Sequence, residues 1–306
     1  MKPILVKSNI YLQHKTINHP ESVDRLIAIY DAIKPIEDDL TILEPKKATI
    51  EQINTIHTKE HILKVKEYSQ KEMSLDLDTQ TSKDSFDVAL YAAGSGITAL
   101  DAIKSSKSNL AFLAIRPPGH HATPNKAMGF CLFNNIAIAA RYAQNIGYKR
   151  VFIVDFDVHH GNGTQDAFYE DNTVFYFSTH QAFAYPGSGN PDEIGKGKGE
   201  GYTFNYPLMP NSTDKEILEV YNDEFPKLVE KFNPDIILVS AGYDLHESDP
   251  LAMLDITFDG IKEIVRAILN RKKDIPKIFF LEGGYEVNAL ATNVKNTILE
   301  MIKFNS

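Results

Sequence analysis

Three side chains at alternate positions, Asp155, Asp157 and His159, could hold a metal ion. Alternate residues of an extended segment face the same side, so Asp157 and His159 can both reach one cation. Asp244, which follows another apolar run, can supply a third ligand. Two carboxylates and one imidazole suit Zn²⁺ or Fe²⁺, and three protein ligands leave a position open for water and substrate. The alternative is an Asp/His hydrogen-bond network without a metal.

Three further side chains could transfer protons or stabilise charge beside such a metal. His120 and His121 are adjacent, so both can face one site only if the backbone turns, which the Pro-Pro-Gly of residues 117–119 permits. One neutral imidazole could take a proton from water, and the other could give one to a leaving amine. Tyr285 follows two glycines and could donate a hydrogen bond to a developing oxyanion. Taken alone, each of these residues would be better explained by packing.

The motifs follow short apolar runs that alternate with amphipathic stretches, a pattern typical of βαβ units and a parallel sheet. Four of the expected strands end in glycine plus acidic, imidazole or phenolic side chains. Ligands of parallel α/β sheets bind beyond the carboxyl ends of the strands, so these four loops should meet in one pocket. The expected strands are residues 109–115, 151–155, 174–178, 235–240 and 277–281, and the expected helices are residues 24–33, 50–68, 134–145, 213–232, 259–270 and 287–303.

The composition is that of an ordinary globular protein. The 306 residues are 43% hydrophobic and 24% charged, which excludes a disordered, collagenous or coiled-coil chain. The formal charge is -9, whereas nucleic-acid-binding proteins are basic, so we expect no nucleic-acid partner. A single cysteine, Cys131, excludes a disulfide framework and suits a reducing compartment. No apolar run approaches the ~18 residues of a membrane span, so we expect a cytoplasmic protein without membrane contact.

Five motifs together resemble the histone deacetylase superfamily, which includes bacterial deacetylase-like amidohydrolases, acetylpolyamine amidohydrolases and acetoin-utilization proteins. Residues 116–122 read RPPGHHA, 129–135 read GFCLFNN, 155–165 read DFDVHHGNGTQ, 240–244 read SAGYD and 282–285 read EGGY. The resemblance extends from His19 to Tyr285. It implies one catalytic domain over residues 1–306, with an arginase-like α/β fold and a central, mostly parallel sheet of about eight strands flanked by helices.

The resemblance also implies roles for the catalytic and metal-binding residues. It assigns Zn²⁺ to Asp157, His159 and Asp244. It assigns His121 as the general base, His120 as its electrostatic or acid partner, and Tyr285 as the group that polarises the substrate carbonyl. Asp155 and Asn162 belong to the same catalytic set. Some branches carry Asp where this chain has Asn162, and the Asn version looks like the class II branch and its bacterial relatives.

Further implied residues would contact the substrate or bind potassium. Gly129, Phe130 and Tyr185 fall where the family lines its acyl-lysine tunnel, Arg25 falls at the inner acetate cavity, and Asp78 falls at the rim, where a carboxylate holds the substrate backbone. The resemblance implies two structural K⁺ sites, bound mostly through carbonyl oxygens. The first would use Asp155, Asp157, His159, Ser178 and Thr179, and the second Phe168, Asp171, Val174 and Tyr202.

Together with these residues, the resemblance implies zinc-dependent hydrolysis of the acetyl or acyl amide of the lysine ε-amino group by metal-activated water, with Fe²⁺ as the other ion that the ligands suit. The substrate would be an acetylated lysine peptide or protein, or, as the close alternative, an acetylated polyamine. A third alternative is a catalytically silent binding scaffold. Arginase-like hydrolysis with two Mn²⁺ needs further Asp and His ligands that the motifs lack.

Several other patterns have simpler explanations. His57 and His61 fit the His-x-x-Glu-His pattern of inverted zincins, with both imidazoles on one helix face, but we favour a partly exposed helix pair near the surface. The glycine-rich residues 195–201 follow no strand and are expected to form a flexible, hairpin-like loop rather than a phosphate cradle. His180 and His246 flank the predicted site and are expected to be polar loop residues.

Overall fold

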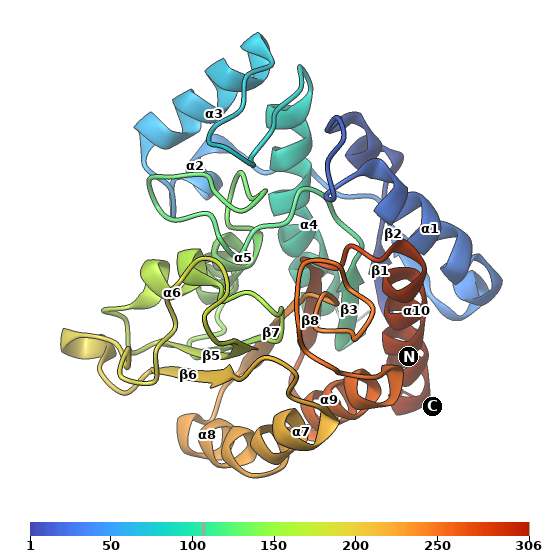
Figure 1. Ribbon diagram of the computed structural model, residues 1–306, viewed down its shortest axis with the longest axis vertical. Helices are drawn as coiled ribbons and strands as arrows, with labels where there is room; N and C mark the ends of the chain where they lie inside the picture. The colour runs from blue at the N-terminus through green and yellow to red at the C-terminus, as the bar shows by residue number, and fades with distance from the viewer. Residues whose placement is uncertain (106–107, 306) are drawn as a thin grey trace.

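An eight-stranded parallel sheet forms the centre of the computed structural model, which describes residues 1–105 and 108–305 (Figure 1). Its strand order is β2-β1-β3-β8-β7-β4-β5-β6. The predicted single-domain α/β fold with a parallel sheet is therefore confirmed. The strands are β1 (Ile4–Val6), β2 (Thr41–Leu43), β3 (Leu110–Leu113), β4 (Val151–Asp155), β5 (Val174–Gln181), β6 (Thr203–Leu208), β7 (Ile236–Ala241) and β8 (Lys277–Leu281).

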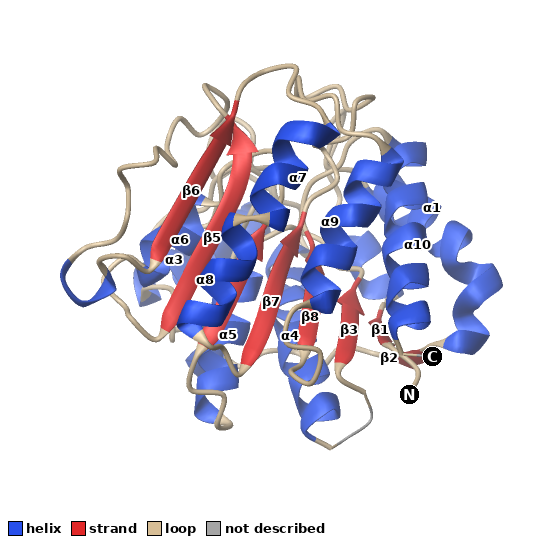
Figure 2. Ribbon diagram, turned by 90° about the horizontal axis from the view of Figure 1, so that it is seen from below, coloured by secondary structure: helices blue, strands red, loops and turns tan. Residues whose placement is uncertain are grey.

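Helices cover both faces of the sheet. They are α1 (Val23–Ile33), α2 (Ile50–Ile53), α3 (Lys59–Lys71), α4 (Ser85–Lys104), α5 (Asn135–Asn145), α6 (Asn162–Phe168), α7 (Asp214–Asn222), α8 (Glu224–Phe232), α9 (Phe258–Asn270) and α10 (Val287–Phe304), with short 3-10 turns η1 (Asn9–Gln13), η2 (Lys34–Asp39) and η3 (Gly197–Gly199). Helices α7, α8, α9, α10 and α1 form one layer, and α4, α5 and α6 form the other (Figure 2). Helices α2 and α3 pack outside α5 and α4.

The strands that the apolar runs predict are β3, β4, β5, β7 and β8, the inner part of the sheet. Their side chains are buried on both faces, which explains why they read as continuous apolar runs. Strands β1, β2 and β6 are not predicted by the sequence pattern. The first two have only three residues each, and β6 is an edge strand that mixes polar residues with Pro207.

Two predicted helices are each divided in the structure. The predicted helix 213–232 becomes α7 and α8, because Pro226 in the first turn of α8 cannot donate the hydrogen bond that a continuous helix needs. The predicted helix 50–68 becomes α2 and α3, since the side chain of Thr58 accepts a hydrogen bond from the backbone of His61 and caps α3. His57 therefore lies outside both helices, contrary to the expected single helix face.

The glycine-rich residues 195–201 form part of a long connection and not a hairpin. Strand β6 follows this segment and runs parallel to β5, whereas a hairpin would join antiparallel strands. The segment contains the short turn η3. The predicted loop is therefore present, but the prediction that it forms a hairpin is wrong.

Helix α4 is a 20-residue element that the sequence pattern does not predict. It is long and apolar enough to cross a membrane by length and composition, but 78% of its most apolar window is buried inside the protein. We therefore describe it as a core helix. Gly94 permits close packing, because a Cβ there would lie 1.8 Å from the carbonyl oxygen of Lys46.

The sheet places the chemical motifs together, beyond the carboxyl ends of its strands. Strands β3, β8, β7 and β4 are neighbours, and their carboxyl ends lead to His120 and His121, Tyr285, Asp244, and Asp157, respectively. In Figure 2 the strands all point in the same direction, and loops gather beyond their arrowheads. The predicted convergence of four loops is thus built into the strand order.

We predict that Gly94→Ala destabilises the protein, although alanine is normally the better helix former. The added methyl group would force the backbone near Lys46 away from α4, so we expect unfolding free energy to fall by about 2 kcal/mol. Denaturant unfolding measures this change, with the exposed Lys104→Ala on the same helix as control. Stabilisation by Gly94→Ala would show that the close approach to residue 46 is not a constraint.

Candidate metal and catalytic site

Asp157, His159 and Asp244 form a compact cluster whose ligand atoms all lie within 4.8 Å of one another. The imidazole Nδ1 of His159 lies 3.3 Å from Oδ1 of Asp157 and 3.2 Å from Oδ2 of Asp244. Both carboxylates are fully buried, and the histidine is only slightly accessible. The three predicted metal ligands therefore come together in the geometry that one cation requires.

Backbone groups fix the direction of these carboxylates. The N–H of His159 donates to Oδ1 of Asp157, and the N–H of Gly283 donates to Oδ2, both at 2.9 Å. The N–H of Val158 donates to Oδ1 of Asp244 at 3.0 Å. The carboxylates thus stay in place without help from a flexible side chain.

Glycines leave the space around the carboxylates open. A Cβ at Gly242 would lie 2.0 Å from Oδ2 of Asp157, and a Cβ at Gly283 would lie 2.1 Å from Oδ2 of Asp244. Any other residue at either position would push a carboxylate out of the cluster. The glycines of the SAGYD and EGGY motifs are therefore part of the ligand cradle.

The electrostatics of the cluster favour a bound cation. Burial and the neighbouring charge of Asp157 raise the pKa of Asp244 to about 7. Burial alone would lower the pKa of His159, but hydrogen bonds to Asp157 and Asp244 outweigh it and raise the pKa to about 10. Two buried carboxylates this close need a positive charge between them. Two oxygens and one imidazole nitrogen are a donor set that fits Zn²⁺ or Fe²⁺.

His120 and His121 lie beside the cluster with opposite electrostatic character, and their ring centroids are 4.0 Å apart. Nδ1 of His120 lies 3.1 Å from Oδ2 of Asp155. Burial would lower the pKa of His120, but the charges of Asp157 and Asp155 raise it to about 10. By contrast, burial and the neighbouring His120 lower the pKa of His121 well below its usual value. One ring is thus disposed to carry a proton and the other to be neutral.

Asn162 and Asp155 hold these two rings in position. Oδ1 of Asn162 lies 2.9 Å from Nδ1 of His121, so the amide is the partner of the neutral imidazole. Asp155 also accepts a hydrogen bond from the hydroxyl of Tyr176 at 3.1 Å. An amide partner stabilises a neutral ring, whereas a carboxylate partner stabilises a charged one. Asn162 brings no negative charge to His121, so burial and the neighbouring His120 still lower the pKa of that ring, whereas the carboxylate of Asp155 helps to raise the pKa of His120.

The backbone and ring of Tyr285 are held from two sides. Oδ2 of Asp249 accepts hydrogen bonds from the backbone N–H groups of Tyr285 at 2.6 Å and Glu286 at 3.2 Å. The guanidinium of Arg25 lies 5.0 Å from the centre of the Tyr285 ring and donates to the carbonyl oxygen of Gly284. Burial raises the pKa of the Tyr285 phenol well above its usual value, so the hydroxyl keeps its proton.

A narrow cavity of about 220 Å³ leads to these residues. Gly129 has a positive φ of 54°, and a Cβ there would lie 2.4 Å from the His121 ring. Phe130 packs edge-on against Tyr285, and Tyr185 packs edge-on against His121. The predicted wall residues therefore line the cavity, together with the predicted rim residue, and its full lining is Asp78, His121, Gly129, Phe130, His159, Tyr185, Leu251 and Tyr285.

Arg25 lies behind the cavity in a buried charge network that the sequence analysis misses. Both Arg25 and Arg116 pair with the carboxylate of Glu21, and all three side chains are inaccessible to solvent. Burial would raise the pKa of Glu21, but the two guanidinium groups lower it to about 2. Glu21 and Arg25 are four residues apart, the spacing of a helical ion pair, but Arg116 lies 95 residues further along the chain, so no local pattern marks its contact with Glu21.

The residues of the two predicted potassium sites lie beside the cluster and at the opposite end of β5. Ser178 on β5 is paired in register with Asp155 on β4. Its hydroxyl oxygen lies 2.9 Å from Nδ1 of His180. At the other location, the carbonyl oxygens of Phe168 and Tyr202 accept hydrogen bonds from the backbone of Asp171 and Tyr176. The ligand roles of both sets stay predictions.

The expected surface position of His57 and His61 is wrong. His57 and His61 are buried, and each holds the loop that carries the catalytic histidines and Phe130. Nε2 of His57 accepts from the backbone of Asn134 at 2.8 Å, and Nε2 of His61 lies 2.9 Å from the carbonyl oxygen of Leu132. Backbone groups thus occupy both ring nitrogens of His57 and Nε2 of His61, which leaves His57 no nitrogen free for a metal ion. His180 was expected to be a loop residue but lies within strand β5, whereas His246 lies in the loop after β7 as expected. Both are buried, and neither lines the 220 Å³ cavity.

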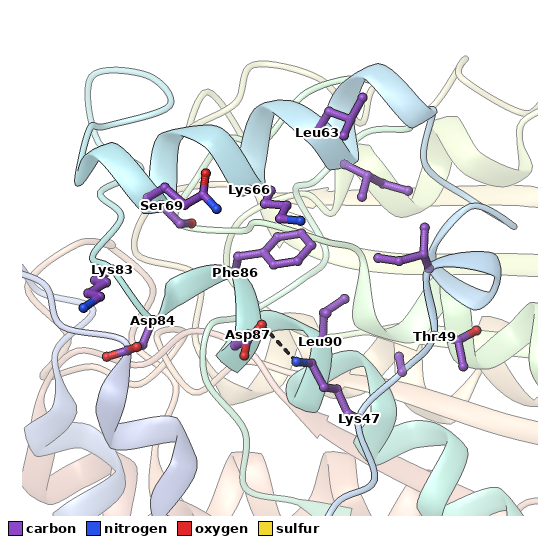
Figure 3. A pocket seen from close by; sticks show the side chains of 14 residues that line it. Lys47, Thr49, Leu63, Lys66, Ser69, Lys83, Asp84, Phe86, Asp87 and Leu90 are labelled. Atoms are coloured by element: carbon purple, nitrogen blue, oxygen red, sulfur yellow. Dashed lines mark ion pairs between the residues drawn. The ribbon is translucent and has the colours of Figure 1, made fainter.

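A larger cavity of about 670 Å³ lies away from the cluster, between α3 and the first half of α4 (Figure 3). Its lining includes Leu63, Phe86 and Leu90 together with an ion pair between Lys47 and Asp87. It contains neither histidine nor any member of the Asp157–His159–Asp244 cluster. Size alone therefore does not identify the site, whereas the convergent polar groups do.

Comparison with known proteins decides the family. The histone deacetylase domain model matches residues 19–301. The chain belongs to the histone deacetylase family. It is 40% identical to histone deacetylase 14, chloroplastic, of Arabidopsis thaliana, over 95% of this chain and 74% of that protein. It is also 40% identical to a probable deacetylase of Archaeoglobus fulgidus, over 90% of this chain and 79% of that protein.

A solved structure of the family confirms the fold. The crystal structure of the HDA15 HD domain aligns with a TM-score of 0.92 and 32% sequence identity, covering 98% of this chain and 90% of that one. The predicted membership and the predicted fold of this histone deacetylase-family protein are therefore both confirmed.

We predict that His57 makes this histone deacetylase-family protein sensitive to acid. Burial lowers the pKa of His57 to about 3 in the folded state, whereas the ordinary value is 6.5. Below pH 6.5 the unfolded chain binds a proton that the folded chain does not, so stability falls as the pH decreases. Between pH 7.5 and 5.5 this one group should remove about 1 kcal/mol of unfolding free energy.

The matched variant is His57→Gln, which keeps an acceptor for the backbone of Asn134 and does not titrate. The stability difference between the natural chain and this variant should shrink by about 1 kcal/mol from pH 7.5 to pH 5.5, measured by urea unfolding. An equal difference at both pH values would show that His57 has the same pKa in the folded and the unfolded chain.

Proposed function

We propose that this chain is a zinc-dependent amidohydrolase that removes an acyl group, foremost acetyl, from the ε-amino group of lysine. Family membership and relatives named as deacetylases support deacetylase activity. The observation that carries the proposal is the buried Asp157–His159–Asp244 cluster, which contributes His159 to the lining of a small cavity of about 220 Å³. Beside that cluster lie two histidines whose pKa values are shifted in opposite directions, raised for His120 and lowered for His121.

Asp157, His159 and Asp244 would hold Zn²⁺, with Fe²⁺ as the other ion that this donor set suits. When bound, the ion polarises the amide carbonyl and lowers the pKa of a neighbouring water molecule. The protein contributes a rigid arrangement, since backbone N–H groups already fix both carboxylates.

The two histidines divide the proton transfers between them. His121 is the base, because its lowered pKa keeps it neutral and Asn162 holds its Nδ1, leaving Nε2 to take the proton of the attacking water. His120 is charged next to Asp155 and supplies the proton that the leaving amine needs. The C–N bond breaks, and the products are a carboxylate and a free amine.

Tyr285 stabilises the charge that develops on the carbonyl oxygen. Its raised pKa keeps the phenol protonated, so the hydroxyl can donate a hydrogen bond. Removal of one such donor typically lowers turnover by roughly a hundredfold to a thousandfold. The side chain lines the cavity and packs against Phe130, so it lies next to any group that enters.

The first experiment measures hydrolysis of a fluorogenic acetyl-lysine peptide by the zinc-loaded chain, beside acetylputrescine and acetylspermidine. We expect cleavage of the peptide, loss of both metal and activity in Asp157→Ala, and a roughly hundredfold lower kcat in Tyr285→Phe. The metal control is His57→Gln, which should retain zinc. Cleavage of the polyamines alone would move the substrate to that class, and no turnover with bound zinc would favour the binding scaffold.

We also predict that Asp249 acts on catalysis through Tyr285. Its carboxylate accepts both backbone N–H groups at the start of the Tyr285 loop, and an amide at this position replaces an acceptor with a donor. Asp249→Asn should lower kcat by roughly tenfold to a hundredfold with little change in KM, because the hydroxyl of Tyr285 is displaced.

A double-mutant cycle separates this effect from general destabilisation. In the Tyr285→Phe background, Asp249→Asn should cause little further loss of kcat. The exposed Asp223→Asn serves as a control for the same chemical change. Losses that multiply fully in the double variant would show that Asp249 acts independently of the tyrosine.

A further inference from the structure

Five exposed large apolar side chains lie on the three loops that supply Asp78, Tyr185 and Leu251 to the active-site cavity. We call them the rim cluster: Leu77, Phe183, Tyr185, Leu251 and Met253. Phe183 is 90% exposed and Met253 is 58% exposed, and Leu77 is fully exposed. Single apolar side chains on a surface are ordinary, but a group of them beside a cavity marks a binding surface.

The rim cluster is continuous with the cavity and comes from three loops. Tyr185 and Leu251 line the cavity themselves, and Leu77 is the neighbour of the cavity residue Asp78. The loops after β5 and β7 are joined, because the backbone N–H of Met253 donates to Oε1 of Gln181 at 2.6 Å. A molecule that inserts one end into the cavity therefore touches the rim cluster with the part that stays outside.

The backbone keeps Phe183 on the surface at an energetic cost. Its φ is 61°, in the left-handed region that a residue with a large side chain rarely adopts. The ring is nevertheless almost fully exposed, two residues before Tyr185 in the same loop.

The cavity is too small to hold a whole substrate. Its volume of about 220 Å³ is below the ~300 Å³ lower limit of typical ligand pockets, so it admits the acylated side chain and little more. The rest of a polyamine would place ammonium groups among the apolar side chains, with Asp78 as the carboxylate that lines the cavity mouth. A polypeptide with apolar neighbours would instead bury the rim cluster.

From this arrangement we infer that the substrates are acylated lysines in polypeptide segments that carry large apolar residues beside the lysine. The inference rests on the proposed lysine deacylase function and specifies its substrate class. Asp78 stands at the same rim, where its carboxylate can accept hydrogen bonds from the backbone of such a segment. The rim cluster then selects the sequence around the lysine, and the cavity selects the acylated side chain.

The test compares two acetyl-lysine peptides of equal length and charge with the zinc-loaded full chain. One peptide has Leu and Phe on either side of the acetyl-lysine, and the other has Ser and Gly. We expect kcat/KM to be about tenfold higher for the apolar peptide, through KM, since burial of one large apolar side chain is worth about that factor. Acetylputrescine is assayed in parallel.

The rim variant is Leu77→Ser combined with Phe183→Ser, and the matched control is Leu63→Ser, an exposed leucine on α3 that lies outside the rim cluster. The preference for the apolar peptide should fall to about twofold or less in the rim variant and stay intact in the control. Thermal unfolding checks that all variants fold.

The outcomes separate this inference from the function on which it rests. Equal cleavage of both peptides by the natural chain, or faster cleavage of acetylputrescine than of either, overturns the inference and leaves amide hydrolysis standing. A preference that survives in the rim variant overturns the assignment to the rim cluster. Absence of any hydrolysis overturns the proposed function and the inference together.

Discussion

The site depends on two carboxylates, Asp157 and Asp244, that lie close together where water is excluded. Such a pair is unfavourable without a positive charge, and the raised pKa of Asp244 reflects that cost. Backbone N–H groups from the loops after β4 and β8 hold the two side chains against their mutual repulsion. The parallel sheet provides this arrangement, because neighbouring strands deliver their loops to the same edge. A bound divalent cation is the simplest charge that makes the arrangement stable.

A second buried charge network supports the first from behind. Glu21 pairs with Arg116 and Arg25, and Arg116 also donates to the backbone carbonyl oxygens of Tyr11 and His14. Arg25 continues the network to the backbone of Gly284, directly before Tyr285. The N-terminal segment is thus fastened to the loop after β8. The carboxylates of Asp157 and Asp244 present negative charge to the cavity, and the network around Glu21 holds the loop after β8 in place.

Much of this could be predicted from the sequence, and the reasons are physical. The inner strands are buried on both faces, so they stand out as apolar runs, and the motifs after them must meet because parallel strands end at one edge. Strands β1 and β2, at one side of the sheet, have too few residues for any periodicity. Helix α4 is buried on most sides, so it lacks the amphipathic pattern that reveals surface helices.

Side-chain positions that are set by contacts with distant parts of the backbone could not be predicted from the sequence. His57 was expected near the surface, yet its partners are the backbone of Thr123 and Asn134, more than sixty residues along the chain. The carboxylate of Asp249 accepts a hydrogen bond from the backbone N–H of Tyr285, which lies 36 residues away, and no local pattern marks that contact. The cluster of Asp157, His159 and Asp244 was predictable because spacing and strand ends determine it. The residues that hold the surrounding loops, such as His57 and Asp249, were not predictable, because no local pattern marks their contacts.

The most direct test of the account is the position of the metal. Crystals of the zinc-loaded chain, measured at the zinc absorption edge, would locate the ion by its anomalous scattering. The account predicts one strong peak between Asp157, His159 and Asp244, and its loss in Asp157→Ala. A peak at His57 and His61, or no peak among the three residues at full zinc occupancy, would contradict the central claim that these side chains form the catalytic metal site.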